Sequence, residues 1–346
     1  MSKSKDILTP FGWLYGKIAN FRNTLYDKGI FGSHSLGART ISIGNITTGG
    51  TGKTPLVAFV AEILAERGEK VCILTRGYGR DKSRARVLVS DSNNILVDAR
   101  TGGDEPVELA KKLLGNAIVI ADSNRVSAAK WALEKFEITA FVLDDGFQHR
   151  RAKRDLDIVC VDATNPLGGG LMLPAGILRE PVENLRRTDA VVVTRANLVD
   201  HADDIAIAIR KHNISCSIFL SENGVWELKT LEEFYANTQG TQDEKEIERS
   251  MAFCALGNPE NFFEMLRQDG FDLAKTKAFP DHHFYKQQDI DGLAKQAKAF
   301  EVNALMTTAK DAVKLNDLKF EIPCYVVEIK PLISDADEFR EMISAS

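Results

Sequence analysis

Cysteine is scarce in this 346-residue chain, and its few copies form no metal-binding pattern. No two cysteines stand as CxxC, and most of them lie within apolar runs. A structural zinc site needs clustered ligands, so none is expected. Buried, reduced thiols in a cytosolic protein are the simplest interpretation. The five are Cys72, Cys160, Cys216, Cys254 and Cys324.

Long hydrophobic runs and an excess of positive charge are also missing. No stretch approaches the ~18 apolar residues of a membrane-spanning helix, and no apolar signal-peptide core follows Lys3 and Lys5. The formal net charge of −5 argues against a general nucleic-acid binder. We therefore expect a cytoplasmic protein, most simply a monomer, whose contact with any membrane is peripheral.

Residues 1–35 predict an amphipathic helix. Thr9 and Pro10 fit the N-cap and the first helical position. Residues 1–40 carry six Lys or Arg against two Asp. Aromatic and basic residues together are typical of a helix at a membrane interface, although periodicity alone equally allows a helix packed on its own domain. The apolar and aromatic residues are Phe11, Trp13, Leu14, Tyr15, Ile18, Phe21, Leu25 and Tyr26.

The centre of the chain alternates short apolar runs with helical patterns, the helices being predicted over Lys53–Arg67 and Arg125–Phe136. Buried parallel strands are rich in Val and Ile, and strand–helix alternation predicts a parallel sheet with helices on both faces. The predicted strands are Thr40–Gly44, Val71–Thr75, Ala117–Ala121, Thr139–Leu143, Ile158–Val161 and Ala190–Thr194.

The strongest motif is a glycine-rich run between the first of these strands and the first helix. Backbone amides in such a loop, together with the helix dipole, bind phosphate oxygens. Lys53 can reach the β- and γ-phosphates, and the Thr54 hydroxyl can ligate Mg²⁺. The context predicts a P-loop NTPase-like α/β fold and an ATP-dependent kinase. The nucleotide-binding residues are Thr47, Thr48, Gly49, Gly50, Thr51, Gly52, Lys53 and Thr54.

After about residue 215 the alternation of apolar runs and helical patterns becomes less regular. Glu222–Gly224, between two apolar runs, predicts a hairpin, and the polar residues 238–249 predict a linker or surface loop. The sequence thus predicts a P-loop kinase domain over residues 36–215, a hairpin and linker over 216–250, and a smaller α/β domain over 251–346. Strands of the smaller domain are predicted at Ala252–Leu256, Ala304–Thr307 and Cys324–Val327, and helices near Glu260–Gln268 and Gln287–Phe300.

Acidic residues follow at two loops. Asp144 and Asp145 close an apolar strand, where a carboxylate faces the phosphate loop and can hold Mg²⁺ directly or through water; an exposed turn is the alternative. The turn Gly102–Pro106 precedes a helix and contains Asp104 and Glu105. Asp104 could simply cap that helix, and Glu105 is a further candidate for the metal.

Histidines and arginines complete the candidate site. The run Asp281–His283 could hold a metal, but without distant partners a general base or its partner is the better interpretation. Arg76, Arg179 and the basic stretch His149–Arg154 lie in predicted loops. Arginine suits bidentate contact with phosphate, although a solvated basic surface is the alternative for each.

Together these motifs resemble the tetraacyldisaccharide 4′-kinases, the lipid A 4′-kinases of Gram-negative bacteria. Thr47, in place of the usual first glycine of the loop, is typical of that family, whereas Ala309 stands where the family commonly has Glu. The matching stretches span about residues 10–315. They are Gly44–Pro55, Thr75–Gly79, Gly103–Pro106, Asp144–His149, Arg154–Asp157, Leu173–Gly176, Leu178–Pro181, Asp281–His282 and Thr308–Lys314.

The resemblance implies transfer of the ATP γ-phosphate to the 4′-hydroxyl of a tetraacyldisaccharide 1-phosphate, which forms lipid IVA in lipid A biosynthesis. It implies Mg²⁺ as cofactor and a site at the cytoplasmic face of the inner membrane, which favours the interfacial interpretation of residues 1–35. It also implies that Asp104 and His282 activate the sugar hydroxyl, with His283 as the alternative partner, and that Lys53 takes part in catalysis. Candidates for binding the lipid headgroup are Arg76, Tyr78, His149, Arg179 and Glu180.

Two other functions remain to be weighed. An ATPase of the deviant P-loop class carries a signature lysine five residues before the loop lysine, where this chain has Thr48. A membrane-bound scaffold with a vestigial nucleotide site would not need the intact Lys53, Thr54, Asp104 and Asp144. The absence of the signature lysine and the intact site residues therefore both favour the kinase.

Overall fold

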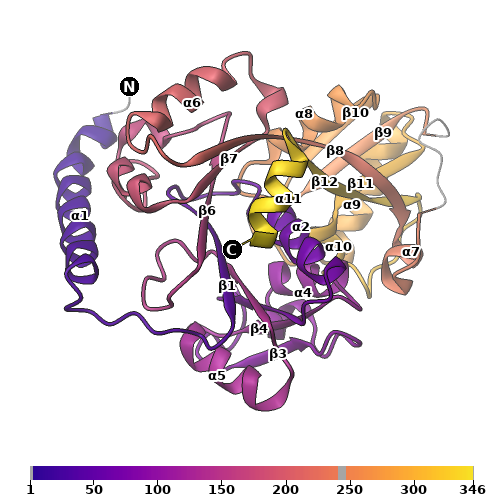
Figure 1. Cartoon of the computed structure of the whole chain (residues 1–346). Coiled ribbons are helices and arrows are strands. Elements are labelled where there is room, and N and C mark those ends of the chain that lie inside the picture. The colour runs from indigo at the N-terminus through magenta and orange to yellow at the C-terminus, as the bar shows by residue number, and fades with distance from the viewer. Residues whose placement is uncertain (1–2, 241–246, 346) are drawn as a thin grey trace.

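The computed structural model describes residues 3–240 and 247–345, and a twelve-stranded sheet runs through it (Figure 1). The strand order is β10-β9-β11-β12-β8-β7-β6-β1-β5-β2-β4-β3. The strands are β1 (Arg39–Asn45), β2 (Val71–Thr75), β3 (Val87–Ser90), β4 (Ala117–Ala121), β5 (Ala140–Asp144), β6 (Leu156–Asp162), β7 (Ala190–Thr194), β8 (Ser217–Thr230), β9 (Ser250–Cys254), β10 (Leu273–Ala278), β11 (Ala304–Thr308) and β12 (Cys324–Ile333). The helices are α1 (Lys3–Asp27), α2 (Lys53–Glu66), α3 (Ala99–Gly102), α4 (Asp104–Lys112), α5 (Arg125–Lys135), α6 (Ala202–Arg210), α7 (Leu231–Ala236), α8 (Pro259–Gln268), α9 (Gln287–Ala299), α10 (Ala309–Ala312) and α11 (Ala336–Ala345), with short 3₁₀ turns η1 (Gly168–Gly170), η2 (Val182–Arg187) and η3 (Ala196–Leu198).

The predicted parallel sheet with helices on both faces is confirmed. Strand β1 lies between β5 and β6 and runs parallel to both. Because successive strand side chains point to opposite faces, β5 feeds two cores. Val142 joins the cluster under α2, α4 and α11, whereas Phe141 and Leu143 join the cluster under α5. Helix α6 covers the same face as α5, further along the sheet.

The hairpin predicted at Glu222–Gly224 is wrong, because residues 217–230 form the single strand β8. Residues 217–221 pair in parallel with β7, and residues 221–230 pair antiparallel with β12. Hydrogen-bonding partners are thus present along the whole strand, and they outweigh the local preference of Asn223 and Gly224 for a turn.

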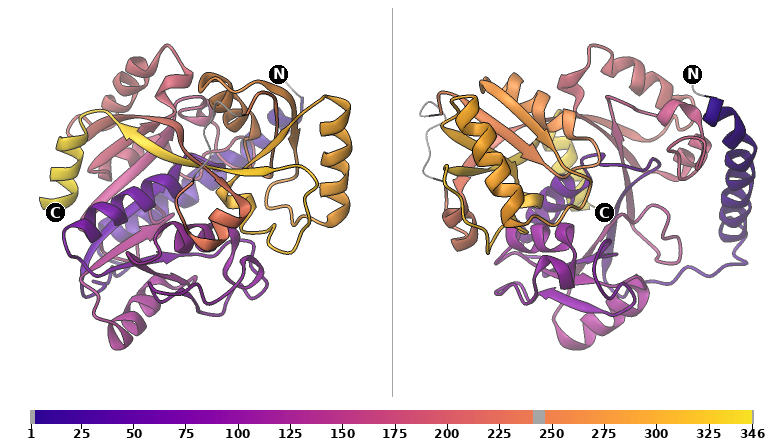
Figure 2. Two further views of the ribbon diagram at one scale, coloured as in Figure 1. Left: turned by 90° about the vertical axis from the view of Figure 1, so that its right-hand side faces the viewer. Right: turned by 180° about the vertical axis from the view of Figure 1, so that it is seen from behind.

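Strand β8 also decides how the two parts of the sheet face each other. It continues beyond the carboxyl end of β7, and β12 returns antiparallel along this extension. Because β11, β9 and β10 run parallel to β12, their carboxyl ends point back toward the carboxyl ends of β1, β5 and β7. The loops at the two sets of strand ends therefore meet. Figures 1 and 2 show this smaller C-terminal unit, formed by β9 to β12 with α8 to α10, beside the P-loop unit, whereas the yellow helix α11 packs back against α2.

Helix α1 stands at the margin of the molecule, as the view from behind in Figure 2 shows. It begins at Lys3, so the N-cap predicted at Thr9 is wrong: Pro10 lies inside the helix, where it removes one backbone donor without ending the helix. Gly12 and Gly16 face the protein, and a side chain at Gly12 would collide with the carbonyl of Met172.

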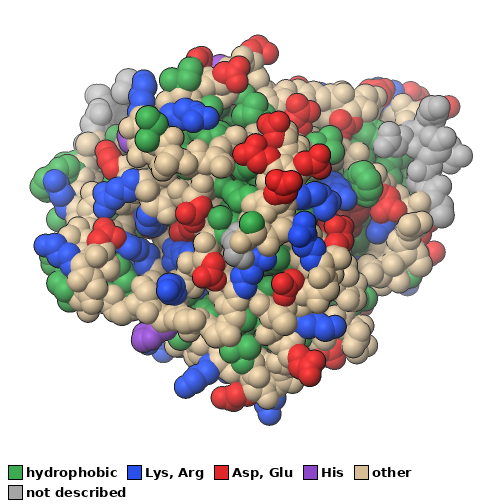
Figure 3. Space-filling view, viewed as in Figure 1, with side chains coloured by type: hydrophobic (Ala, Val, Ile, Leu, Met, Phe, Trp, Pro, Cys, Tyr) green, Lys and Arg blue, Asp and Glu red, His purple; other side chains and the backbone are tan. Residues whose placement is uncertain are grey.

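The apolar stripe of α1 is largely exposed. Its members recur at helical spacing and are each more than half exposed, and Figure 3 shows green and blue side chains intermixed along the left edge where α1 lies. Among the described residues no helix, α1 included, is long and apolar enough to cross a membrane. We call this set the outer stripe. It consists of Ile7, Phe11, Leu14, Ile18 and Phe21.

Other differences from the sequence patterns lie in polar segments. Strand β10, with the sequence LAKTKA, was not predicted, because two of its lysines interrupt the apolar run. Helices α6 and α11 were also not predicted. Of the predicted polar loop at residues 238–249, residues 241–246 lie outside the described part of the chain.

Phe339 of α11 allows a test of this core. Its ring has no exposed surface and lies 5.1 Å from the ring of Phe219 and 6.1 Å from that of Phe59. Phe339→Ala should lower the free energy of unfolding by about 3–5 kcal/mol, because a cavity replaces the buried ring. Chemical denaturation measures this. Leu332→Ala, at a side chain that is 56 % exposed, is the control and should change stability by less than about 0.5 kcal/mol; equal midpoints for the two variants contradict the packing.

Candidate active site

The phosphate loop is shaped by glycines and by the strand ends around it. Gly49 and Gly52 have φ angles of 102° and 75°, a region that glycine adopts without steric cost, and Gly52 caps α2. The Asn45 amide donates to Thr51 Oγ1 (3.0 Å), and the Thr194 hydroxyl donates to the Thr51 carbonyl (2.9 Å). Residues at the ends of β1 and β7 therefore fix the position of Thr51 in the loop.

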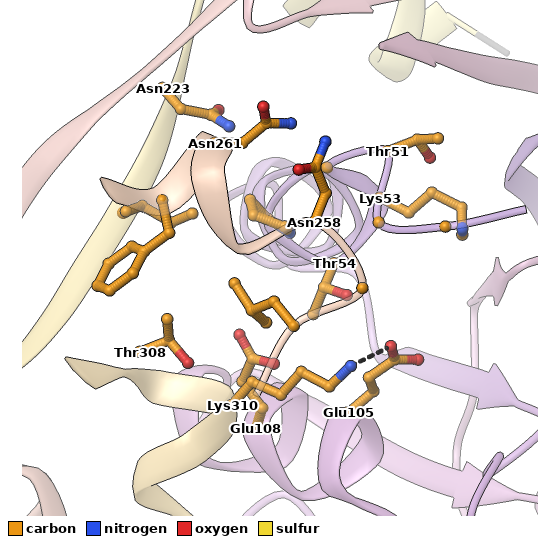
Figure 4. Close-up of a pocket in the computed structure, with 18 of the residues that line it drawn as sticks. Thr51, Lys53, Thr54, Glu105, Glu108, Asn223, Asn258, Asn261, Thr308 and Lys310 are labelled. Carbon is orange, nitrogen blue, oxygen red and sulfur yellow. Dashed lines mark hydrogen bonds and ion pairs between the residues drawn. The ribbon is translucent and has the colours of Figure 1, made fainter. Parts of the chain in front are cut away.

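The loop forms one wall of a pocket of about 490 Å³ between the two units. All eight predicted nucleotide-binding residues, from Thr47 to Thr54, line it. Figure 4 shows Lys53 and Thr54 on one side, with Asn258 and Asn261 at the start of α8 above them. Thr308 and Lys310 close the pocket from the end of β11. Both units thus contribute to one binding space.

Asp145 lies in this pocket and is held by two cations. Arg179 donates to both of its carboxylate oxygens, at 2.6 and 2.9 Å, and Lys53 Nζ lies 3.7 Å away. Burial alone would raise the pKa of Asp145, but Lys53 and Arg179 lower it to about 2. The residue also has a left-handed backbone, with φ of 52°. The carboxylate is therefore ionised and fixed beside the lysine of the loop.

Asp144 lies behind Asp145 and is buried. Its Oδ2 accepts a hydrogen bond from the Thr75 hydroxyl at 2.8 Å. Burial, followed by the charges of Glu105 and Asp145, raises the pKa of Asp144 to about 6. Three acidic groups that repel one another at a phosphate loop form an environment that a cation would stabilise.

Asp104 and His282 meet although they are far apart in the sequence. His282 Nδ1 lies 2.8 Å from Asp104 Oδ2 and 3.1 Å from Oδ1. His282 lines the pocket, whereas Asp104 is 4 % exposed beneath it. His283 instead pairs with Asp289 at 3.1 Å and stacks on Phe279. Of the two histidines, His282 is therefore the one in contact with Asp104.

The contact between Asp104 and His282 shifts the pKa values of both groups. Burial would raise the pKa of Asp104, but the hydrogen bond with His282 and the charges of Lys310 and Lys314 lower it to about 2. The same hydrogen bond raises the pKa of His282, against the effect of burial. His282 also adopts a left-handed backbone with φ of 60°, a conformation that is uncommon for residues other than glycine.

Lys310 and Lys314 also lie at this site, although the sequence patterns predicted no role for either of them. Lys310 Nζ lies 3.0 Å from Glu105 Oε1 and 3.8 Å from Asp281, and Figure 4 marks its pair with Glu105 by a dashed line. Burial would lower the pKa of Lys310, but these carboxylates raise it. Lys314 lies 3.6 Å from Asp104. The stretch Thr308–Lys314 contained both lysines, but their partners Glu105 and Asp104 are more than 200 residues away in the sequence.

The candidate headgroup residues separate into two groups. Arg76, Tyr78 and Arg179 line the main pocket. Glu180 does not: it is buried and accepts hydrogen bonds from Arg187 and from Asn23 of α1, so it holds α1 on the protein.

A second cavity, of about 270 Å³, lies beneath α1. It includes Arg179 and Glu180, so Arg179 belongs to both cavities. His149 lines neither; burial, followed by the charges of nearby arginines, lowers its pKa to about 4, which leaves the imidazole neutral. The other lining residues of this cavity are Tyr15, Ile18, Ala19, Arg22, Asn23 and Gln148.

Comparison with known proteins reveals similarity over the whole chain. Residues 4–346 match the model of the tetraacyldisaccharide-1-P 4′-kinase family. The chain is 37 % identical to tetraacyldisaccharide 4′-kinase of Desulfotalea psychrophila, covering 99 % of this chain and 97 % of that protein. It is 38 % identical to the enzyme of the same name from Geobacter metallireducens, covering 87 % and 86 %. The crystal structure of LpxK from Aquifex aeolicus in complex with ATP superimposes with a TM-score of 0.79 at 32 % identity, covering 99 % of this chain and 98 % of that one.

Replacing Asp144 or Asp145 by asparagine should change the free energy of unfolding in opposite directions. With a folded-state pKa of about 6, Asp144 binds more protons folded than unfolded between about pH 4 and 6, so its contribution to stability falls as the pH rises through that window. Without nucleotide or divalent cation, Asp144→Asn should raise the free energy of unfolding at pH 8 by about 1–3 kcal/mol.

Asp145→Asn is the matched variant. The folded-state pKa of Asp145 is about 2, so its stabilisation is complete above about pH 4 and is lost as the pH falls toward 2. This variant should be about 1–3 kcal/mol less stable than the wild type at pH 8. Denaturant titrations at pH 8 measure both. Destabilisation by Asp144→Asn equal to that by Asp145→Asn contradicts the assigned electrostatics.

Proposed function

The chain belongs to the tetraacyldisaccharide-1-P 4′-kinase family, and we propose that the pocket between its two units carries out that family's reaction. The protein is an ATP-dependent tetraacyldisaccharide 4′-kinase of lipid A biosynthesis, and it transfers the γ-phosphate of ATP to the 4′-hydroxyl of tetraacyldisaccharide 1-phosphate. What remains to be assigned is the role of each residue. The observation that carries the assignment is the contact of Asp104 with His282 at the pocket that the phosphate loop lines.

In this proposal the phosphate loop binds the triphosphate of ATP. Its backbone amides and the N-terminus of α2 face the pocket, an arrangement that favours phosphate oxygens. Lys53 is held near Asp145 at 3.7 Å and would exchange this pair for the β- and γ-phosphates. Since phosphoryl transfer needs positioning and charge neutralisation rather than covalent chemistry, these contacts account for much of the catalysis.

The residues at the loop fit a magnesium ion. Within the described residues no three His, Cys, Asp or Glu side chains converge to hold a metal by themselves, but Mg²⁺ with ATP usually takes one or two carboxylates and completes its shell with phosphates and water. Thr54 and the Asp144–Asp145 pair would hold it, with Glu105 as a further candidate. When bound, the ion neutralises charge that develops on the transferred phosphoryl group.

The Asp104–His282 pair would accept the proton of the 4′-hydroxyl. His282 faces the pocket, and the ionised Asp104 behind it supplies the negative charge that attracts the proton. A carboxylate that orients and deprotonates the attacking hydroxyl is the role an aspartate plays in other kinases. We therefore treat the two residues as one catalytic unit rather than as separate groups.

The second cavity and the outer stripe suggest how the lipid approaches. Arg179 lines both cavities, so it would contact the anionic headgroup beside the phosphate loop, together with Arg76 and Tyr78. The substrate carries four acyl chains and cannot leave the bilayer cheaply, because each buried CH₂ is worth about 0.8 kcal/mol. We propose that α1 inserts its outer stripe into the cytoplasmic leaflet of the inner membrane.

The predicted domain boundaries serve as a functional division in this proposal. Residues 36–215 bind the triphosphate and carry Asp104, whereas residues 251–346 deliver His282 and the two lysines. Strand β8, within residues 216–250, joins the two parts. In addition, α11 packs back onto the core of the P-loop unit through Phe339 and Ile343.

The phosphate loop and the base should each be indispensable. Lys53→Ala and Asp104→Asn should each lower the transfer of labelled phosphate from ATP to the lipid, in detergent, by at least ~100-fold while the circular dichroism spectrum is preserved. Lys298→Ala, at an exposed ion pair on α9, is the control and should retain full activity. A wild-type rate in Asp104→Asn refutes the assignment of the base.

Membrane binding should depend on the outer stripe. Replacing Phe11 and Phe21 together by Ser removes two exposed rings and should reduce co-sedimentation with phosphatidylglycerol-containing vesicles at least tenfold, because buried apolar area drives interfacial binding. Trp226→Ser, at an exposed aromatic residue on β8, is the matched control. Unchanged vesicle binding by the double variant removes the membrane role of α1.

A further inference from the structure

Behind the Asp104–His282 pair lies a buried cation that the mechanism above does not use. The side chain of Lys314 has no exposed surface. Its ammonium lies 3.6 Å from Asp104 Oδ2 and 3.1 Å from Asp311 Oδ1. The ring of Tyr285 lies 5.6 Å away. Two carboxylates and an aromatic ring therefore surround one positive charge out of contact with water.

The position of Lys314 is fixed from the C-terminal unit. Asp311 is fully buried, and its Oδ2 accepts hydrogen bonds from the backbone amide of Ala255 (3.0 Å) and from the Thr308 hydroxyl (2.7 Å). These partners follow β9 and end β11, two strands of the C-terminal unit. Asp311 is thereby anchored, and in turn it holds the Lys314 ammonium toward the neighbouring unit.

On the other side, the Asp104 carboxylate is held from several directions. Its Oδ1 accepts a hydrogen bond from the backbone amide of Glu105 (3.0 Å). The imidazole of His282 contacts both oxygens, and Lys314 approaches Oδ2. The backbone of α4 and two side chains of the C-terminal unit thus determine the orientation of this carboxylate.

A buried charge is costly if its only role is to stabilise the fold. Removing an ion from water costs several kcal/mol even after relaxation, and well-packed apolar residues often stabilise a protein as well as a buried ion pair does. The Lys314 ammonium forms no hydrogen bond of normal geometry within the described structure. Its interaction with both carboxylates is therefore chiefly that of a point charge, which acts on the position and ionisation of its neighbours.

We propose that Lys314 is a positioning residue for phosphoryl transfer, acting through Asp104. It links the anchored Asp311 of the C-terminal unit to the catalytic carboxylate of the P-loop unit and holds that carboxylate against His282. A displacement of about 1 Å at a reacting group can lower a rate about 100-fold. This inference rests on the proposed role of Asp104 as part of the base.

Lys310 and Lys314 each contact a different member of the adjacent acidic pair Asp104 and Glu105. Lys310 lies within α10, and Lys314 follows just after the end of this helix. Lys310 contacts Glu105 and lines the pocket, whereas Lys314 contacts Asp104 and is buried. Loss of Lys314 should therefore affect the chemical step and leave nucleotide binding intact.

The experiment compares steady-state kinetics of Lys314→Met with the wild type. The substitution keeps an unbranched side chain that is one atom shorter, and it removes the charge. We expect kcat to fall at least about tenfold, with the KM for ATP and for the lipid changed less than about twofold. Lys298→Met is the matched control, because that lysine is exposed on α9, and it should keep the wild-type kcat.

Because Lys314→Met leaves Asp311 without its cation, a second variant guards against loss of folding. Asp311→Asn/Lys314→Met removes both charges and leaves an amide oxygen for the Ala255 N–H, so it should fold. It should show the same loss of kcat as the single variant. A wild-type kcat in this folded double variant overturns the proposal.

A further comparison separates positioning from general structural support. In the Asp104→Asn background, Lys314→Met should lower kcat by less than about twofold, because the group it positions is already gone. A further loss of tenfold or more refutes action through Asp104. A wild-type kcat in Asp104→Asn itself refutes the assignment of the base, whereas an inactive Asp104→Asn beside a fully active Asp311→Asn/Lys314→Met refutes the role of Lys314 alone.

Discussion

The hydrogen bond between His282 and Asp104 joins the C-terminal unit to the P-loop unit. It connects the loop after β10 with the N-terminus of α4, and it has a length of 2.8 Å. The contact exists because β8 carries the chain past the carboxyl end of β7 and β12 returns beside it. The strand ends of the C-terminal unit then face the phosphate loop.

Two pairs of adjacent acids form the rest of the site, and each is balanced by two cations. Asp144 and Asp145 lie near Lys53 and Arg179, whereas Asp104 and Glu105 lie near Lys310 and Lys314. The first pair of cations comes from the P-loop unit and the second from the C-terminal unit. A triphosphate that enters the pocket meets Lys53 from one unit and Lys310 from the other, and each of these lysines lies beside a carboxylate that orients it.

Local patterns predicted the parts of the site that lie within one element. The bounds of β2, β4 and β7 match the predicted strands, since unbroken Val and Ile runs identify buried strands. The phosphate loop was predicted because its glycines, Lys53 and Thr54 are contiguous. The hairpin at Glu222–Gly224 was wrong, because pairing partners for β8 come from distant strands. Lys314 was missed for the same reason: its partner Asp104 is brought to it by tertiary structure.

The central claim is that Asp104 and His282 act as one unit across the two parts of the molecule. A double-mutant cycle on the single-turnover rate of lipid phosphorylation tests it most directly, using Asp104→Asn, His282→Asn and the double variant. Asparagine tolerates the left-handed backbone at position 282. We predict that the double variant is no slower than the slower single variant, within about threefold. Rate losses that multiply in the double variant contradict the claim.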